Sequence, residues 1–191
     1  TKSEIDNIFV KGRPVENDRP APIEHKLGIS KPVLDGKIND FEYGLITNST
    51  FNLRSGEMTI ETTWAFGRDT DNLYVGCITR KPEHEAKITA RDGSVWQDES
   101  IELHVEYKGT KWQFVINSKG AFYDSKNDKY SWNSTTFRQK HALTSNAWIF
   151  EGAISFKDLG IPAGEGSKVY VTMGRSGGHG ASYTAATPLF K

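Results

Sequence analysis

The sequence predicts an all-β fold, a two-sheet antiparallel β-sandwich of the jelly-roll kind with little helix. Short segments rich in β-branched and aromatic residues recur at short, fairly even spacing between Gly, Asn, Asp and Pro residues, which is typical of sandwich domains. Two of these segments, 100–107 and 111–118, alternate between apolar and polar residues, as half-buried strands do. Helical signal is confined to residues 82–88 and 156–160, each long enough for a turn or two.

Each expected strand ends at turn-forming residues, such as Asp69–Asn72 after the third and Ser118–Gly120 after the sixth. The expected strands are residues 23–30, 41–47, 57–66, 72–79, 100–107, 111–118, 137–144, 147–156 and 168–175.

The alternation in the two central segments assigns their faces. A strand places successive side chains on opposite sides of its sheet. The residues expected in the core are Ile101, Leu103, Val105, Trp112, Phe114 and Ile116. The residues expected on the other face are Ser100, Glu102, His104, Glu106, Gln113, Val115 and Asn117. The polar face is therefore the one that can carry chemistry.

Length and composition fit a single domain. The chain has 191 residues, a usual size for one sandwich, which we expect at residues 23–191. Residues 1–22 are polar and contain Pro, which is typical of an extended arm or a linker. A chain of this size buries roughly 70% of its unfolded surface, so it needs no metal or disulfide to fold.

Charge and apolar content restrict the partners. Lys plus Arg and Asp plus Glu number 24 each, with no basic block, which disfavours nucleic acid and anionic membranes and suits a neutral ligand. The chain begins at TKSEID without an apolar leader and has no long apolar run. We therefore expect a soluble protein whose signal peptide was removed or never present. The single Cys77 has strand periodicity and is expected to be a buried small hydrophobe.

The five tryptophans fall into two environments. Trp64, Trp112 and Trp148 occupy apolar-periodic positions and are expected in the core. Trp96 and Trp132 lie in loops dense in polar residues, with few apolar neighbours to cover them. An exposed indole can stack on the C–H face of a sugar while nearby carboxylates and amides bond its hydroxyls. The alternative for both rings is that they fold back over the edge of the core.

The order of five segments resembles the family 9 carbohydrate-binding modules. They are DNLYVGC, VWQDESIELHVE, WQFVINSKGAFYD, AWIFEGAISFKDLG and VYVTMGR, preceded by VLDGKINDFEYG, and together they span residues 32–190. The most specific part is the series Trp96, Asp98, Glu99 and Glu102, followed by Gln113, Phe114 and Asn117. The resemblance implies a sandwich that clamps a terminal sugar between two aromatic rings and holds structural calcium. It also implies secretion, to the periplasm or outside the cell, as part of a polysaccharide-degrading enzyme.

The resemblance also implies roles for particular residues. Trp96 matches the first aromatic ring of the clamp, Glu102 the acidic hydrogen-bonding residue on the next strand, and Asn117 the amide on the strand after it. The family places the second aromatic ring, a Trp, just before the last strand, where this chain offers only the smaller Tyr183. Trp132 is a further candidate for stacking.

One departure from the family concerns an arginine. Val115 stands where sugar-binding members can carry Arg, so the hydrogen-bond donors of a guanidinium group are missing there. Arg175, at the end of a predicted strand, could supply a replacement guanidinium. A solvated charge at the strand end explains Arg175 equally well.

Two loops are rich in the oxygen ligands that calcium prefers. The predicted ligands in them are Asp69, Asp71, Asp124 and Asp128. Neither loop follows the helix-loop-helix calcium pattern, and turn-forming Asx residues without metal explain each loop alone. The resemblance implies at least one calcium site, which could also involve Asp35, Asp40 or Glu42. The five histidines lack zinc-ligand spacing.

A catalytic function is disfavoured. Glu102 and Glu106 lie four residues apart on one strand, about 13 Å at the usual rise, whereas paired glycosidase carboxylates lie about 5 to 9.5 Å apart. Glu99 would face the opposite side of the sheet from Glu102, and no Ser occupies a nucleophile elbow.

Two other functions stay open. Met58, Met173 and His104 could hold haem for electron transfer, although Met173 has the periodicity of core filler. A structural or protein-binding sandwich without sugar affinity is the other alternative. We expect a non-catalytic module that binds a polysaccharide or oligosaccharide, as a monomer or as part of a multidomain enzyme.

Overall fold

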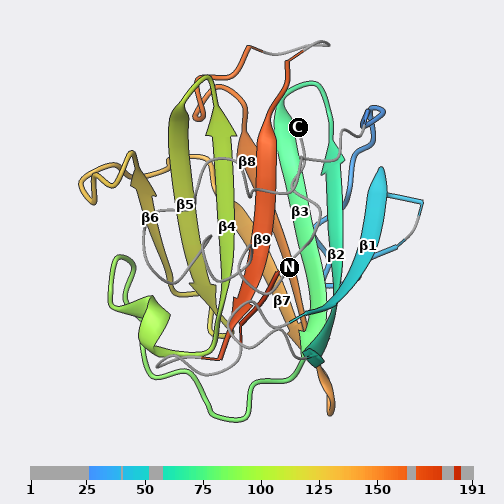
Figure 1. Ribbon diagram of the computed structural model, residues 1–191, viewed down its shortest axis with the longest axis vertical. Helices are drawn as coiled ribbons and strands as arrows, with labels where there is room; N and C mark the ends of the chain where they lie inside the picture. Colours follow the sequence, from blue (N-terminus) through green and yellow to red (C-terminus); the bar gives the residue numbers. More distant parts are fainter. Residues whose placement is uncertain (1–25, 40, 52–57, 163–166, 178–182, 186–191) are drawn as a thin grey trace.

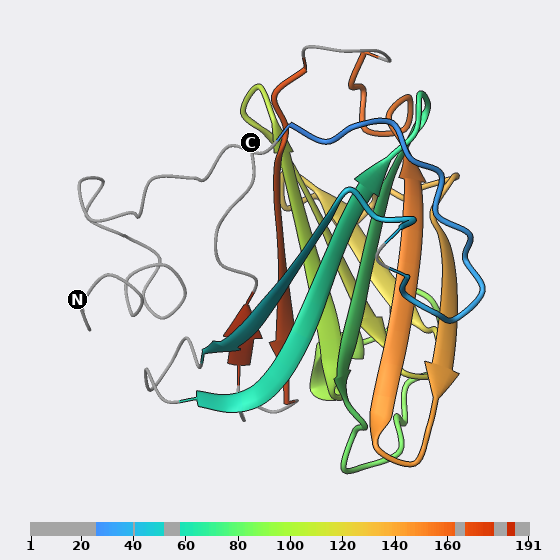
Figure 2. The same cartoon turned by 90° about the vertical axis from the view of Figure 1, so that its right-hand side faces the viewer.

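The computed structural model describes residues 26–39, 41–51, 58–162, 167–177 and 183–185. Two antiparallel sheets of five strands each pack face to face (Figures 1 and 2). The only helical element among the described residues is a short 3₁₀ turn, η1 (Val95–Gln97). The predicted all-β sandwich is therefore confirmed, whereas the arm predicted for residues 1–22 lies outside the described residues.

We call the two sheets sheet I and sheet II. Sheet I has the order β1-β2-β3-β8-β7, with β1 (Leu45–Phe51), β2 (Met58–Arg68), β3 (Asn72–Arg80), β8 (Ala147–Ser155) and β7 (Arg138–Leu143). Sheet II has the order β10-β9-β4-β5-β6, with β10 (Tyr183–Ala185), β9 (Tyr170–Ser176), β4 (Ser100–Tyr107), β5 (Thr110–Asn117) and β6 (Phe122–Lys126). The short β10 lies against β1, where the two sheets approach each other (Figure 2).

Most predicted strands are found within two residues of their expected bounds, with four differences. Residues 26–30 form no strand, although the Ser30 amide donates to the Arg68 carbonyl of β2, and the strand predicted for 41–47 starts only at Leu45. Residues 82–88 form bends instead of a helical turn. β6 and β10 were not predicted as separate strands, because both are short and mostly polar.

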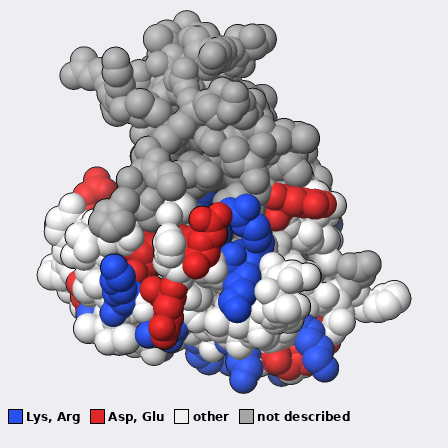
Figure 3. Space-filling model, turned by 90° about the horizontal axis from the view of Figure 1, so that it is seen from below, with Lys and Arg blue, Asp and Glu red and all other residues white. Residues whose placement is uncertain are grey.

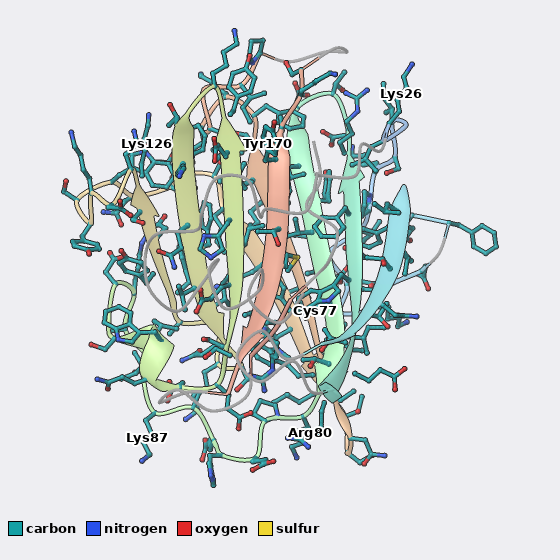
Figure 4. The ribbon with its side chains drawn as sticks, viewed as in Figure 1. Lys26, Cys77, Arg80, Lys87, Lys126 and Tyr170 are labelled. Atoms are coloured by element: carbon teal, nitrogen blue, oxygen red, sulfur yellow. The ribbon has the colours of Figure 1, made fainter. Side chains whose placement is uncertain are left out.

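The core lies between the sheets and contains the side chains that the alternation assigned to it. Ile101, Leu103, Phe114 and Ile116 are fully buried there. Trp64, Trp112 and Trp148 are buried as predicted. Cys77 also lies between the sheets (Figure 4), and burial raises the pKa of its thiol to about 12. A thiol with that pKa is not a nucleophile at neutral pH, so the predicted small hydrophobe is confirmed.

Residues 26–39 and 41–44, here called the strap, cross the outer face of sheet I (Figure 2). Tyr43 of the strap packs with buried side chains of β2, β3 and β8. The carboxylate of Glu151, on β8, is fully buried and accepts hydrogen bonds from the Asp35 and Gly36 amides and the Tyr43 hydroxyl. Gly36 has φ of 88°, a conformation that only glycine adopts without strain. The strap is therefore an integral layer of the fold.

Among the described residues, the structure contains no helix that meets the length and hydropathy required to span a bilayer.

Candidate functional site

The outer face of sheet II is polar, and the strand register defines its rows. Glu102 lies between Gly174 of β9 and Val115 of β5. One row further along, His104 lies between Thr172 and Gln113. The side chains of Glu102 and His104 are 16% and 37% exposed, and their Oε2 and Nε2 atoms are 3.4 Å apart.

Trp96 stands beside these rows, at the β6 side of the sheet. It belongs to η1, in which Val95 is fully buried while the Trp96 side chain points outward and is 49% exposed. Its ring meets that of Tyr123, on β6, edge to face, with centroids 5.5 Å apart. Tyr123 shares a register row with Val115 and Glu102. The predicted exposure of Trp96 is therefore confirmed, and the ring adjoins the polar face.

A buried network holds the loop that presents Trp96. Asp98 accepts hydrogen bonds from the Lys87 and Ile88 amides, at 3.0 and 2.9 Å, and from Nδ2 of Asn117 at 2.9 Å. Burial alone raises the pKa of Asp98, but these donors outweigh it and leave the pKa below its ordinary value. The charged carboxylate therefore pins residues 87–98 to β5 and fixes the position of Trp96.

Asn117 belongs to this network and not to the polar surface. Its side chain is fully buried, and besides Asp98 its Nδ2 donates to the Ile88 carbonyl. Its Oδ1 accepts from the Lys119 and Ala121 amides. The structure thus gives Asn117 a positioning role in place of the predicted sugar contact, because its amide already serves the turn after β5.

Arg175 likewise points inward. Its side chain is 1% exposed and lies over the Trp148 ring, 5.3 Å from the centroid. It donates to Glu99 Oε2 at 2.6 Å and to the Ser176 carbonyl. Burial lowers the pKa of Arg175, and Glu99 opposes that effect. Neither the predicted sugar donor nor a solvated strand-end charge describes this group, because β9 directs residues 171, 173 and 175 into the core.

The other two predicted aromatic residues lie in different environments. Trp132 is partly buried and contacts the core ring of Phe114 edge to face, with centroids 6.1 Å apart. It follows the alternative in which the ring covers the edge of the core. Tyr183 pairs with Ser176 at the β10 edge of sheet II, opposite the β6 edge where Trp96 stands. The polar rows therefore lie between Trp96 and β10.

The carboxylates predicted as metal ligands are already bonded to protein donors. Asp69 accepts from the Asp71 and Asn72 amides and from the Tyr74 hydroxyl, closing the β2–β3 turn. Asp124 is fully buried and accepts from the Arg91 guanidinium and the Ser134 amide. These residues therefore do not fit a calcium site.

The exposed predicted ligands lie beside these turns: Asp71 follows Asp69, and Asp128 has a left-handed backbone at φ 59°. No group of three or more His, Cys, Asp or Glu in the described ranges is arranged to hold a metal ion. Asp40 lies outside the described residues, while Glu42 has one buried carboxylate oxygen without a hydrogen-bond partner. Of the predicted calcium ligands that the structure describes, Glu42 is thus the one with a buried oxygen that lacks a hydrogen-bond partner.

The predicted haem ligands do not converge. Met173 is fully buried in the core, whereas His104 lies on the outer face of the same sheet. Side chains on opposite faces of one sheet cannot ligate one iron. The side chain of Met58 lies outside the described residues.

Charge at the η1 end of the sandwich is mixed. Lys and Arg side chains alternate there with Asp and Glu over the described surface, as seen from below in Figure 3. Lys87 and Arg80 lie at this end, whereas Lys126 and Tyr170 lie at the other (Figure 4). A surface of interspersed signs suits a neutral ligand better than a polyanion.

Sequence reasoning missed two aromatic residues of this region, Tyr123 and Tyr130. Tyr123 lies on β6, which was not predicted as a strand of its own. Tyr130 is 72% exposed, and its ring lies 5.9 Å from that of Tyr123. The available signal for Tyr123 was the pair of aromatic residues Phe122 and Tyr123 directly after the Gly120 turn, a composition typical of a strand.

Comparison with known proteins supports the fold. No protein-family model matches the sequence, and no significant match was found among curated proteins. A family 9 carbohydrate-binding module from Caldicellulosiruptor kristjanssonii in complex with glucose superposes with a TM-score of 0.63 at 14% identity, covering 85% of this chain and 84% of that one. The same kind of module in complex with cellotriose gives 0.59 at 14% identity, covering 85% and 82%.

A third structure is a Bacteroides uniformis ATCC 8492 protein, provisionally assigned as carbohydrate-binding. It gives a TM-score of 0.63 at 12% identity and covers 74% of this chain and 76% of that one. Identities this low establish fold and leave function to the site. The chain therefore has the fold of the family 9 carbohydrate-binding modules.

Proposed function

We propose that this chain is a non-catalytic carbohydrate-binding module whose sugar site lies on the outer face of sheet II, beside Trp96. One observation carries the proposal. An indole that is 49% exposed is held by a buried network next to a row of polar side chains. A large ring held in a fixed, half-exposed position beside polar side chains provides the apolar platform and placed polar groups that a sugar site needs.

The chemistry of the face suits a neutral polyol. The indole offers an apolar surface to the C–H face of a sugar ring. Glu102 and His104 offer an acceptor and a donor for hydroxyl groups, and the amide of Gln113 offers both. Hydroxyl contacts compete with water, so we expect dissociation constants in the micromolar to millimolar range, or about −8 to −4 kcal/mol.

The decisive experiment is isothermal titration of the wild-type chain against glucose, cello-oligosaccharides and a panel of other plant and microbial oligosaccharides. Trp96→Ala is expected to abolish binding because it removes the apolar platform. Phe41→Ala is the matched control, since this ring is 99% exposed but belongs to the strap over the opposite sheet. We expect Phe41→Ala to bind as wild type does.

Two results would contradict the proposal. One is the absence of any sugar ligand for the folded wild-type chain. The other is sugar binding that survives Trp96→Ala unchanged, which would place the site elsewhere. Glu102→Gln gives a finer test, because it keeps the shape but removes the charged acceptor and is expected to weaken binding severalfold.

Such affinity would serve to hold a secreted polysaccharide-active enzyme on its substrate. Fusion of the chain to a hydrolase is expected to raise activity on the insoluble polysaccharide and to leave activity on soluble fragments unchanged. The same fusion carrying Trp96→Ala is the control, and equal activity of the two fusions on the solid substrate would contradict this role.

Structural calcium is a further part of the proposal. Its support is the buried Oε2 of Glu42, which has no hydrogen-bond partner among the described residues and is an oxygen of the kind that calcium prefers. Thermal unfolding in calcium and in chelator tests it, and identical transitions would contradict it.

A further inference from the structure

The β6 edge of sheet II carries three neighbouring aromatic rings, Trp96, Tyr123 and Tyr130, here called the β6 aromatic row. The rings of Trp96 and Tyr130 lie 5.5 and 5.9 Å from that of Tyr123. Tyr123 is 7% exposed, whereas Trp96 and Tyr130 are 49% and 72% exposed. A buried central ring thus supports two exposed rings, one on the η1 loop and one on the β6–β7 loop.

Tyr130 is presented by a turn that is docked on the sheet. Asn127 and Asp128 both have left-handed backbones, with φ of 49° and 59°. The Asn127 amide donates to the Lys111 carbonyl, and the Lys111 amide donates to Asn127 Oδ1, each at 2.8 Å. The Lys129 amide closes the turn on the Lys126 carbonyl at 3.0 Å. The position of the exposed ring is therefore set before any ligand arrives.

Polar groups flank the row. Gln113 of β5 lies opposite Ser125 of β6, whose buried hydroxyl is hydrogen-bonded to Tyr123. Burial raises the pKa of the Tyr123 phenol, the hydrogen bond with Ser125 opposes this rise, and the nearby Tyr130 and Asp128 add to it. The exposed rings of Trp96 and Tyr130 thus lie near the Gln113 amide of β5 and the Asp128 carboxylate of the turn after β6. A linear chain of sugar units likewise presents C–H faces beside hydroxyl groups, so it suits rings that have polar groups next to them.

We propose that the β6 aromatic row binds a linear oligosaccharide across two or more sugar units, with Trp96 and Tyr130 stacked on different units of one chain. This rests on the proposed sugar-binding function and specifies its ligand. A chain can pass along β6 without ending there, because β6 is the edge strand of sheet II and Tyr130 is mostly exposed. The row therefore recognises the interior of a chain as well as its end.

The test compares chain lengths of the sugar that the wild-type chain binds best. By titration, the pentasaccharide is expected to bind at least 10-fold more tightly than the monosaccharide. Reduction of the terminal unit to its alditol is expected to change pentasaccharide affinity less than 2-fold. Tyr130→Ala is expected to weaken pentasaccharide binding about 10-fold, from the loss of one stacking contact, and to leave monosaccharide binding unchanged.

Two further variants separate stacking from folding. Tyr130→Trp keeps an aromatic face and is expected to retain or raise pentasaccharide affinity. Tyr170→Ala, on β9 at the far side of sheet II and 36% exposed, is the matched control and is expected to bind as wild type does. If the wild-type chain binds mono- and pentasaccharide with equal affinity, and Tyr130→Ala does not change that affinity, the proposed binding of several sugar units along the row is wrong. The proposed sugar-binding function would remain intact. Absence of all sugar binding by the wild-type chain would overturn both.

Discussion

The two outer faces of the sandwich each carry a glutamate, and the two glutamates differ in burial and in hydrogen bonding. On sheet I, Glu151 is fully buried under the strap and accepts three hydrogen bonds from it. On sheet II, the Glu102 side chain remains 16% exposed among the polar rows next to His104. Both residues alternate with core side chains in their strands. The difference teaches that period-two alternation identifies an outward face but not whether that face meets solvent.

The strap turns the outer face of sheet I into a second small core. Tyr43, Ala65, Tyr74 and Ala153 are buried together there. On sheet II, the described residues form such a cover over the β6 side, where Val95, Val115, Ala121 and Tyr123 cluster beneath the η1 loop. One outer face therefore supports the fold. The other combines a supported loop with polar strands, and this combination favours ligand binding.

The largest expected effect concerns the interior that both faces share. Arg175→Met is expected to destabilise the chain by about 3 to 5 kcal/mol, because it leaves the Glu99 carboxylate buried without its cation. Arg80→Met is the matched control, since the Arg80–Glu83 pair is exposed, at 53% and 64%, and contributes at most about 1 kcal/mol. Urea unfolding measures both. Equal destabilisation by the two variants would contradict the buried position of Arg175.

A matched pair of glutamate variants tests the comparison of the faces directly. Glu151→Ala leaves two strap amides and the Tyr43 hydroxyl without their acceptor, and is expected to cost about 3 kcal/mol of stability. Glu102→Ala is expected to change stability by less than about 1 kcal/mol and to weaken sugar binding instead. Thermal unfolding and titration together measure this crossed pattern.

Amide hydrogen exchange shows which part of the chain Glu151→Ala destabilises. Faster exchange in residues 26–44 of Glu151→Ala, with sheet II unchanged, is expected. If Glu102→Ala destabilises the chain and Glu151→Ala does not, the assignment of Glu151 to stability and of Glu102 to binding is wrong.

The third prediction concerns acid stability. Burial lowers the pKa of His141 to about 4, and its ring accepts a hydrogen bond from Trp148 Nε1 at 3.0 Å while its other nitrogen lies 2.9 Å from Gln139 Oε1. The unfolded chain binds a proton near pH 6.5, well before the folded chain does. Stability is therefore complete above pH 6.5 and falls as the pH drops towards 4, by at most about 3 kcal/mol.

The measurement is urea unfolding between pH 4.5 and 8. His141→Gln cannot titrate, so its stability is expected to change less over that range. Parallel pH dependence of variant and wild type would show that other groups control acid stability.

Several features of the fold were predictable because they depend on local patterns. The strands 100–107 and 111–118 and the buried Trp64, Trp112 and Trp148 followed from periodicity. Exposure of Trp96 followed from the polar loop around it. These predictions required no knowledge of which segments meet in space.

The roles of Asn117, Arg175 and Glu151 were not predictable, because they depend on contacts between distant segments. Asn117 bonds the Ile88 carbonyl 29 positions away, and Glu151 bonds the Gly36 amide 115 positions away. Arg175 continues the apolar face of its strand, where an arginine is rare unless it is paired. Its partner Glu99 lies 76 positions away, and nothing local connects them.

The smallest expected effect separates the two loop tryptophans. Trp132 is partly buried against Phe114, so Trp132→Ala is expected to lower stability by about 2 kcal/mol and to leave sugar affinity unchanged. Trp96 contacts Tyr123 but is 49% exposed, so Trp96→Ala is expected to lower stability by less than about 1 kcal/mol and to abolish binding. Thermal unfolding and titration of both variants measure the difference. Because both indoles are replaced by the same residue, a larger stability loss for Trp96 would assign its ring to the core and remove it from the proposed site.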